Sequence, residues 1–166
     1  MSLRFLPVDG RNAESVRELS RVATAIVRDY YDPIVGEAQN TYMLVRFQSE
    51  EAIRSQLAAG YAYYLLYDRR IVGFVGFYPR EEDLYLSKFY LYADCRGQGY
   101  GHEALAWLQA EARRRGLGAI SLNVNKHNPT IRVYEHWGFV RVADEKKDIG
   151  GGYYMDDYVY RLPLDR

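Results

Sequence analysis

The longest helical pattern in the chain begins at Ala13. Apolar side chains recur from there at the spacing of one helix face, at Val16, Leu19, Val22, Ala23, Ile26, Val27 and Tyr30. A residue that precedes proline is disfavoured in the helical region, so we expect this helix to break at Pro33. Two shorter helices are predicted in "EAQNTYMLVRFQ" and "SEEAIRSQLAAG", the second with Ser49 as its N-cap and Gly60 as its stop.

Runs rich in β-branched and aromatic residues predict the strands of the first half. Residues 3–8 are expected to form an edge strand, because Pro7 cannot donate to a central ladder. The runs "YAYYLLYD" and "IVGFVGFYP" flank a short turn at residues 68–70 and predict a hairpin. Residues 84–92 continue that sheet as a third strand.

The second half alternates element types. We expect a helix in "HEALAWLQAEARRRG", a strand over residues 119–125, and two closing strands in "FVRVADE" and "YYMDDYVYRL". A short helix is expected between the strand at residues 119–125 and the first closing strand, with Asn128 as N-cap, Pro129 at the first helical position and Gly138 as C-cap. The pattern predicts a single α/β domain over residues 1–166 with a mixed sheet flanked by helices, and one parallel crossover over residues 84–125.

Composition narrows the class of protein. Lysine plus arginine and aspartate plus glutamate both number 22, so the formal net charge of zero argues against a dedicated nucleic-acid-binding protein. The single cysteine, Cys95, excludes a disulfide framework or a cysteine-rich zinc site, and we expect no metal. The start lacks the apolar region of a secretory signal, and no apolar run is long enough to cross a membrane. We therefore expect a cytoplasmic protein.

Glycine is concentrated in "CRGQGYGHEAL", residues 95–105, at the predicted turn from a strand into a helix. Free N–H groups and the positive end of the helix dipole meet at such a turn, which makes it an anion site. Gly97, Gly99 and Gly101 would let the backbone curve around a phosphate, with Arg96 as a neighbouring cation. The stretch matches neither the dinucleotide fingerprint nor the P-loop, and a glycine-rich turn that binds nothing remains an alternative.

Two motifs in order carry a family resemblance. "RGQGYG" resembles the Arg/Gln-x-x-Gly-x-Gly/Ala signature of the GNAT superfamily of acetyl-CoA-dependent N-acetyltransferases, and "LNVNKHNPTIRVYEHWGF" (122–139) resembles its second block. The order of elements fits from about residue 3 to residue 162. The resemblance implies a splay between the strands at about 84–92 and 119–125, where the thioester of acetyl-CoA would lie.

The resemblance also implies a cofactor site. The backbone amides from Gln98 to His102 would hold the pyrophosphate, and the strand around Tyr90 would pair with the pantetheine arm. Asn125 would face the cofactor side, while Asn128 is at least partly explained as a helix cap. The complete set of cofactor-binding residues is expected to be Phe89, Tyr90, Leu91, Arg96, Gly97, Gln98, Gly99, Tyr100, Gly101, His102, Asn125 and Asn128.

Tyr134 matches the general acid of the family. An amine would attack the thioester carbonyl, a backbone N–H of the splayed strand would stabilise the oxyanion, and Tyr134 would protonate the leaving thiolate. The alternative is that Tyr134 has no catalytic role and is one more packed aromatic side chain among the 17 tyrosines. Many relatives carry a glutamate on the strand before the phosphate loop, where this chain has Ser87 and Lys88, so the base stays unassigned. Glu82 and Asp83 are expected to be solvated loop charges.

The acceptor must be recognised by other segments. Residues 28–37 and 150–160 combine tyrosines with carboxylates, which suits a cationic small amine. The carboxylates are Asp29, Asp32, Glu37, Asp156 and Asp157. Solvated surface charges are the alternative explanation.

Several alternatives stay open. The acceptor could be a protein lysine or N-terminus instead of a small amine, and the chain could be a non-catalytic CoA-binding module. A nucleic-acid-binding domain using Arg113 to Arg115 is a further alternative, and the resemblance leaves a homodimer open.

Overall fold

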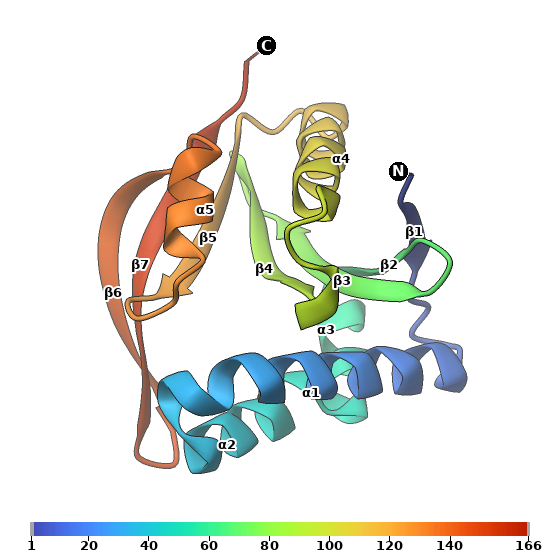
Figure 1. Ribbon diagram of the computed structural model, residues 1–166, viewed down its shortest axis with the longest axis vertical. Helices are drawn as coiled ribbons and strands as arrows, with labels where there is room; N and C mark the ends of the chain where they lie inside the picture. The colour runs from blue at the N-terminus through green and yellow to red at the C-terminus, as the bar shows by residue number, and fades with distance from the viewer. Residues whose placement is uncertain (1, 166) are drawn as a thin grey trace.

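The computed structural model describes residues 2–165, which contain one seven-stranded sheet (Figure 1). The strands are β1 (Arg4–Pro7), β2 (Ala62–Tyr67), β3 (Ile71–Pro79), β4 (Asp83–Leu91), β5 (Ala119–Asn125), β6 (Val140–Gly150) and β7 (Tyr153–Pro163). Their order across the sheet is β1-β2-β3-β4-β5-β7-β6, and β4 and β5 are its parallel pair. The predicted α/β fold with a mixed sheet, an edge strand at β1 and a crossover from β4 to β5 is confirmed.

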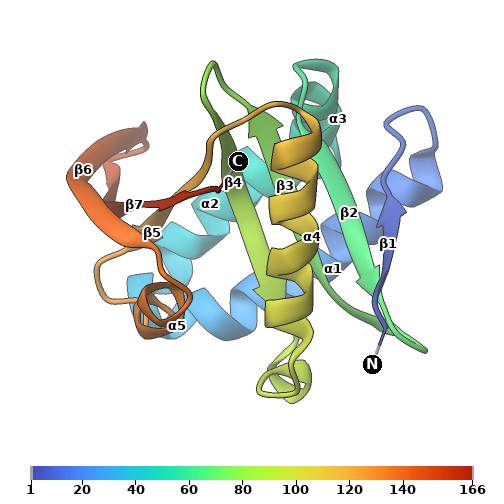
Figure 2. The same ribbon diagram turned by 90° about the horizontal axis from the view of Figure 1, so that it is seen from above.

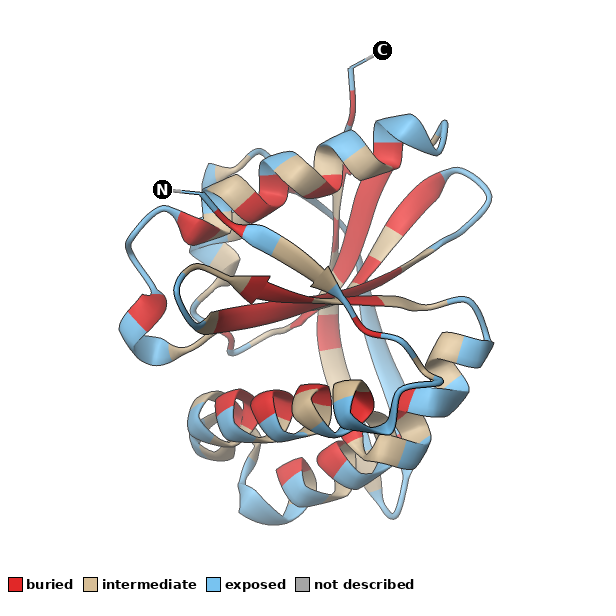
Figure 3. Cartoon of the chain, turned by 90° about the vertical axis from the view of Figure 1, so that its right-hand side faces the viewer, coloured by how far each residue is buried: buried red, intermediate tan, exposed pale blue. Residues whose placement is uncertain are grey.

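Helices cover both faces of the sheet (Figure 2). They are α1 (Ala13–Val35), α2 (Glu37–Gln48), α3 (Glu50–Ala58), α4 (Tyr100–Arg114) and α5 (Ile131–His136), with a 3-10 turn, η1 (Ala93–Cys95), before α4. One apolar cluster joins α4 and α5 to the sheet, and a second joins α1 and α3 to the opposite face. Buried positions accordingly line the strands and the inward sides of the helices (Figure 3). None of the helices within residues 2–165 combines the length and apolar character needed to cross a bilayer.

Helix α1 does not break at Pro33 as expected. It continues to Val35 and ends at Gly36, whose φ of 91° takes the backbone out of the helix and whose N–H donates to the Asp32 carbonyl at 3.0 Å. Proline lacks only its own N–H and has a φ compatible with a helix, so one missing bond in the last turn is tolerated.

The short helix α5 also differs from its predicted bounds. Thr130 rather than Asn128 occupies the N-cap position, and Trp137 is the C-cap, with Gly138 following at a φ of 96°. The Asn128 side chain instead accepts the Thr130 N–H at 2.8 Å, which closes a turn two residues long ahead of the helix. Asn128 therefore shapes the approach to the helix without capping it.

Two features of the strands were not foreseen. β6 extends from Val140 to Gly150, well beyond the predicted end at residue 145, because it pairs with β7 as far as Tyr153. Asp83 is not a solvated loop charge: it is 6% exposed, and its oxygens accept from Arg80 Nε at 2.7 Å and Ser121 Oγ at 2.6 Å. These bonds hold the pKa of Asp83 below its usual range despite burial.

Candidate functional site

The sheet splits between β4 and β5. The two strands pair only from Asp83–Tyr85 on β4 to Ala119–Ser121 on β5, and beyond these residues they diverge. A cavity of about 470 Å³ occupies the gap on the side of α4 and α5. The splay that the family resemblance implied is therefore present, and it opens backbone of both strands to a ligand.

A bulge in β4 lies at the same point. Phe77 of β3 pairs with Leu86, but the preceding Gly76 pairs with Lys88, so Ser87 is an extra residue in β4. The bulge interrupts the alternation of the strand, and Ser87 borders both the first cavity and a second one on the opposite face.

The glycine turn forms one end of the first cavity. Gly97 and Gly99 have φ values of 74° and 89°, a left-handed region that favours glycine, and Gly99 is the N-cap of α4. The first intrahelical bond runs from the Glu103 N–H to the Gly99 carbonyl, and the cap residue makes no side-chain hydrogen bond. The amides ahead of Glu103 thus have no helical partner, which is the arrangement of an anion site.

Gly101 is required for a different reason. A Cβ atom at Gly101 would lie 3.1 Å from the ring of Trp137, so this glycine lets the aromatic side chain that follows α5 lie close to the start of α4. Trp137 also stacks on Phe89 of β4, with ring centres 6.1 Å apart. β4, the start of α4 and the residue that follows α5 therefore meet around the wall of the first cavity.

The predicted cofactor residues divide into two groups. Nine of the twelve line the first cavity: Phe89, Tyr90, Leu91, Arg96, Gly97, Gly99, Gly101, His102 and Asn128. The Gln98 side chain instead donates to the Asp94 carbonyl at 2.8 Å, and the buried Tyr100 donates to Asp68 at 2.7 Å. Asn125 borders the second cavity, and its side chain accepts the His127 N–H at 2.9 Å.

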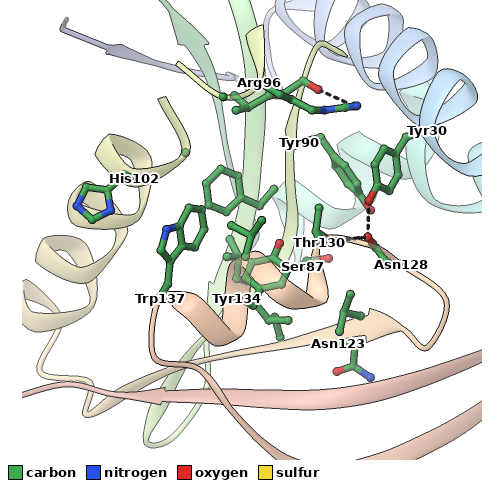
Figure 4. A pocket seen from close by; sticks show the side chains of 18 of the residues that line it. Tyr30, Ser87, Tyr90, Arg96, His102, Asn123, Asn128, Thr130, Tyr134 and Trp137 are labelled. Carbon is green, nitrogen blue, oxygen red and sulfur yellow. Dashed lines mark hydrogen bonds between the residues drawn. The ribbon is translucent and has the colours of Figure 1, made fainter. Parts of the chain in front are cut away.

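Tyr134 extends from α5 into the first cavity (Figure 4). Its ring makes edge contacts with Trp137 and Phe139, at centroid distances of 5.9 and 5.5 Å. Burial, and secondarily the nearby Tyr31 and Tyr30, raise the pKa of Tyr134 above its ordinary value. Within residues 2–165 the Tyr134 hydroxyl has no protein hydrogen-bond partner, so the group is protonated and available to a ligand.

Asn128 connects α1 to the loop before α5. Its Oδ1 accepts from the Tyr30 hydroxyl and from the Thr130 hydroxyl (Figure 4). Its Nδ2 donates to the Tyr31 hydroxyl at 3.0 Å. The Arg96 guanidinium lies 4.9 Å from the centre of the Tyr30 ring, which links the glycine turn to the same group. The sequence placed Tyr30 and Tyr31 in the segment expected to recognise the acceptor, but not beside Asn128, because nothing near them in the chain indicates a partner about a hundred residues away. Thr130, two residues from Asn128, was not expected as a site residue.

A second cavity of about 240 Å³ lies between α1, α2 and the strands β3 to β7. It shares Tyr31, Ser87, Tyr90 and Asn123 with the first cavity, so the two meet at the splay. Its charged lining residues are Arg46, Lys88, Lys147, Glu145, Asp148 and Asp157. The cavity therefore carries three basic and three acidic side chains.

Asp157 is the buried carboxylate of this second cavity. It lies on β7 opposite Asn125 and is 4% exposed. Burial raises the pKa of Asp157 to about 6, against the lowering effects of Asn123 and Lys88. Burial also lowers the pKa of Lys88, and the charge of Asp157 opposes that change.

The other carboxylates proposed to select the acceptor do not line this cavity. Asp32 accepts from Asn40 at 2.8 Å and pairs with Arg28 at 3.6 Å, while Asp156 pairs with Lys126 at 3.2 Å. Asp29 and Glu37 are exposed on the surface. Of the five acids, Asp157 alone borders the second cavity, and sequence reasoning did not indicate that Lys88 would face it.

Cys95 lies outside both cavities. It is 2% exposed and accepts from the Arg70 guanidinium at 3.0 Å, and burial raises the pKa of its thiol. A buried thiol of raised pKa is a poor nucleophile.

Comparison with known proteins agrees with this geometry. Residues 23–139 match the model of the acetyltransferase (GNAT) family. The uncharacterised N-acetyltransferase YycN of Bacillus subtilis is 38% identical over 79 residues, which are 45% of this chain and about half (51%) of that relative's length.

Solved structures share the fold over almost the whole chain. The crystal structure of PaiA N-acetyltransferase from Thermoplasma acidophilum, in complex with coenzyme A, superimposes with a TM-score of 0.74 at 18% identity, over 99% of this chain and all of that one. A GCN5-related N-acetyltransferase from Rhodopseudomonas palustris gives 0.77 at 15% identity, over 98% and 95% of the two chains. YncA from Salmonella typhimurium with acetyl-CoA gives 0.61 at 20% identity, over 100% and 95%. The family model matches most of the chain, the sheet splits between β4 and β5, and α4 begins at a glycine turn. This chain therefore belongs to the GNAT family of acetyltransferases.

Proposed function

We propose that the protein transfers the acetyl group of acetyl-CoA to a primary amine by direct attack. The observation that carries the proposal is the meeting of two cavities at the splay of β4 and β5, one with an uncapped helix N-terminus at its end and the other with a buried carboxylate. Relatives of the same fold have been solved with coenzyme A or acetyl-CoA bound.

The first cavity is assigned to the donor. The amides at the start of α4 bind the pyrophosphate, while the backbone of β4 at residues 89–91 lies along the pantetheine arm. Arg96 adds a cation beside the turn. Acetyl-CoA supplies an activated acetyl group as a thioester, and the splay near Ser87 is where its carbonyl reaches the second cavity.

The second cavity is assigned to the amine. An alkylamine has a pKa near ~10.4, so it arrives protonated and must lose a proton before it can attack. Asp157 faces this cavity and has a raised pKa of about 6, which makes it the proposed proton acceptor. Asp157 takes the first proton of the ammonium before attack. As the C–N bond forms and the C–S bond breaks, the thiolate takes the proton of the Tyr134 hydroxyl, and the second proton that leaves the nitrogen returns to the Tyr134 oxygen.

The shape of the second cavity favours a small acceptor over a folded protein. The hairpin between β6 and β7 reaches α2 (Figure 1), where the Tyr42 hydroxyl donates to the Ile149 carbonyl at 2.8 Å and Gln39 donates to the Tyr154 carbonyl at 2.7 Å. A Cβ at Gly150 would lie 2.6 Å from the Tyr42 hydroxyl, so the hairpin packs tightly there. These contacts close the cavity from that side.

An acetyl-transfer assay tests the proposal directly. The protein is incubated with acetyl-CoA and a panel of polyamines, amino acids, aminoglycosides and peptides, and both thiol release and N-acetylated product are measured. We expect amine-dependent thiol release matched by acetylated product. Binding of acetyl-CoA without transfer to any member of the panel would instead favour a non-catalytic CoA-binding module.

A further inference from the structure

Lys88 and Asp157 are two charged groups that line the same cavity without pairing with each other. Lys88 is partly buried, and its ammonium lies 5.8 Å from the centre of the Phe47 ring on α2. In the part of the chain that the structure describes, no carboxylate comes within the 4.0 Å of an ion pair with Lys88, and its ammonium has no hydrogen-bond partner. Asp157 likewise has no ion pair within that distance, although each group changes the pKa of the other.

Unpaired charges in a partly dry cavity are costly. Burial of an ammonium or a carboxylate costs several kcal/mol in general unless an opposite charge or hydrogen bonds compensate. Among the described residues the fold supplies no opposite charge within ion-pair distance of Lys88, and a bound ligand with an anionic group would supply one.

The backbone of β4 explains why Lys88 is in this cavity. The bulge at Ser87 sets the alternation of the strand so that Lys88 and Tyr90 face α1 and α2, while Phe89 faces α4 and α5. Lys88 thus directly follows Ser87, which borders both cavities, and its side chain lines the second one.

We propose that the second cavity binds an acceptor with an acidic group in addition to its amine, as in an amino acid, with Lys88 binding the acidic group and Asp157 the amine end. This inference rests on the proposed function and refines its acceptor class. An acceptor with two opposite charges can lie between the two side chains, whereas a purely cationic amine would place its charge near the Lys88 ammonium.

The other side chains of the cavity agree with a zwitterion. Its charged groups balance, three basic against three acidic, so the lining does not select for net positive charge. Tyr61, Tyr78 and Tyr85 add aromatic surface that can contact an uncharged portion of the acceptor.

Matched acceptors test this inference. The rate constant kcat/KM is measured for a panel of amino acids, their carboxamides and the corresponding amines without the acidic group. We expect the best amino acid to exceed its carboxamide by roughly tenfold or more, because a charge-assisted hydrogen bond to Lys88 is lost in the amide. Lys88→Met should remove this preference by slowing transfer to the amino acid, with less than about threefold change for the carboxamide.

Controls separate recognition from folding. Lys88→Arg keeps the positive charge and should retain a preference for the amino acid, and Lys146→Met, an exposed cation of β6 outside the cavity, should behave as wild type. Titration calorimetry with the protein saturated with CoA compares binding of the amino acid and its carboxamide without any turnover.

The outcomes are distinct. The inference would be overturned if the amino acid and its carboxamide were acetylated and bound equally well. It would also be overturned if Lys88→Met slowed transfer to both equally, or if neither compound bound. Acetyl transfer with no acid preference leaves the proposed function standing and removes only the inference. Tighter binding of the acid that depends on Lys88, without transfer to any amine, would support the inference and contradict the proposed function.

Discussion

At the scale of the residue, Tyr134 carries the most specific chemical hypothesis. Replacement by phenylalanine keeps the ring contacts with Trp137 and Phe139 and removes only the hydroxyl. General acid catalysis contributes ~10²–10⁴-fold, so we expect kcat of Tyr134→Phe to fall in that range while the Kd for acetyl-CoA stays near the wild-type value. Steady-state kinetics, with chemistry shown to be rate-limiting, and calorimetry measure the two quantities.

The matched control is Tyr67→Phe, which makes the same change on β2 outside both cavities. Near-normal turnover of Tyr134→Phe under these conditions would show that Tyr134 serves packing and does not act as the general acid.

We expect the buried carboxylate of Asp157 to lower the stability of the protein while it contributes to activity. Its folded pKa of about 6 lies above the unfolded value of 3.8, so the native state binds the proton more tightly than the unfolded chain. The free energy of unfolding therefore falls as pH rises from about 4 to about 6, and the cost persists at neutral pH. We expect Asp157→Asn to raise the free energy of unfolding by roughly 1–3 kcal/mol at pH 7.5 and by little at pH 4, while it lowers kcat/KM for the amine.

Denaturant unfolding of both proteins across this pH range measures the effect. Asp156→Asn is the neighbouring control, because Asp156 is half exposed and paired with Lys126, and its replacement should show no such pH dependence. A stability difference for Asp157→Asn that is the same at pH 4 and pH 7.5 would contradict the assigned pKa.

At the scale of the element, the start of α4 and the end of α5 are mutually dependent. Valine at Gly101 would drive its Cβ into the Trp137 ring, 3.1 Å away, and fill space beside the first amides of the helix. We expect Gly101→Val to raise the Kd for acetyl-CoA by tenfold or more, equivalent to about 1.4 kcal/mol. Ala106→Val, on the exposed side of α4, adds bulk to the same helix away from the cavity and should leave the Kd unchanged. Calorimetry on folded variants measures the Kd for acetyl-CoA. The same Kd in the wild type, Gly101→Val and Ala106→Val would show that the donor does not bind at this turn.

At the scale of the whole molecule, the split sheet predicts a strong response to the donor. β4 and β5 pair at three residue positions only, so a molecule bound between them connects the two halves of the sheet. A ligand that binds only the folded state at a hundred times its Kd adds about 2.7 kcal/mol to the free energy of unfolding. For a chain of this size we expect Tm to rise by roughly 5–10 °C with acetyl-CoA, and by less for Gly101→Val at the same concentration. A thermal scan that shows no dependence on acetyl-CoA concentration would exclude binding in the splay.

Much of the fold was predictable because its signals are local. The β2–β3 hairpin, the helix that follows the glycine turn and the strand at residues 119–125 each depend on neighbours within a few positions. Two errors arose where a longer-range contact decides: β6 extends because β7 pairs with it, and Asp83 is buried because Ser121 and Arg161 reach it from other strands. The end of α1 and the cap of α5 were local errors. For the candidate site, the glycine turn and Tyr134 were readable as motifs, whereas Trp137 and the bonds around Asn128 were not.

The sequence by itself determined the order of elements and the glycine turn at a helix start, since these follow from periodicity and from spacing within short segments. It also carried the two motifs whose resemblance indicated the family. Only the tertiary structure decided which charges face the place of reaction. Asp157 lies on β7 and Lys88 on β4, and they share a cavity because the sheet splits and a bulge at Ser87 turns one side chain toward the other face. A neighbouring carboxylate, Asp156, points to Lys126 instead, a difference that strand alternation in the folded sheet sets and that composition cannot reveal.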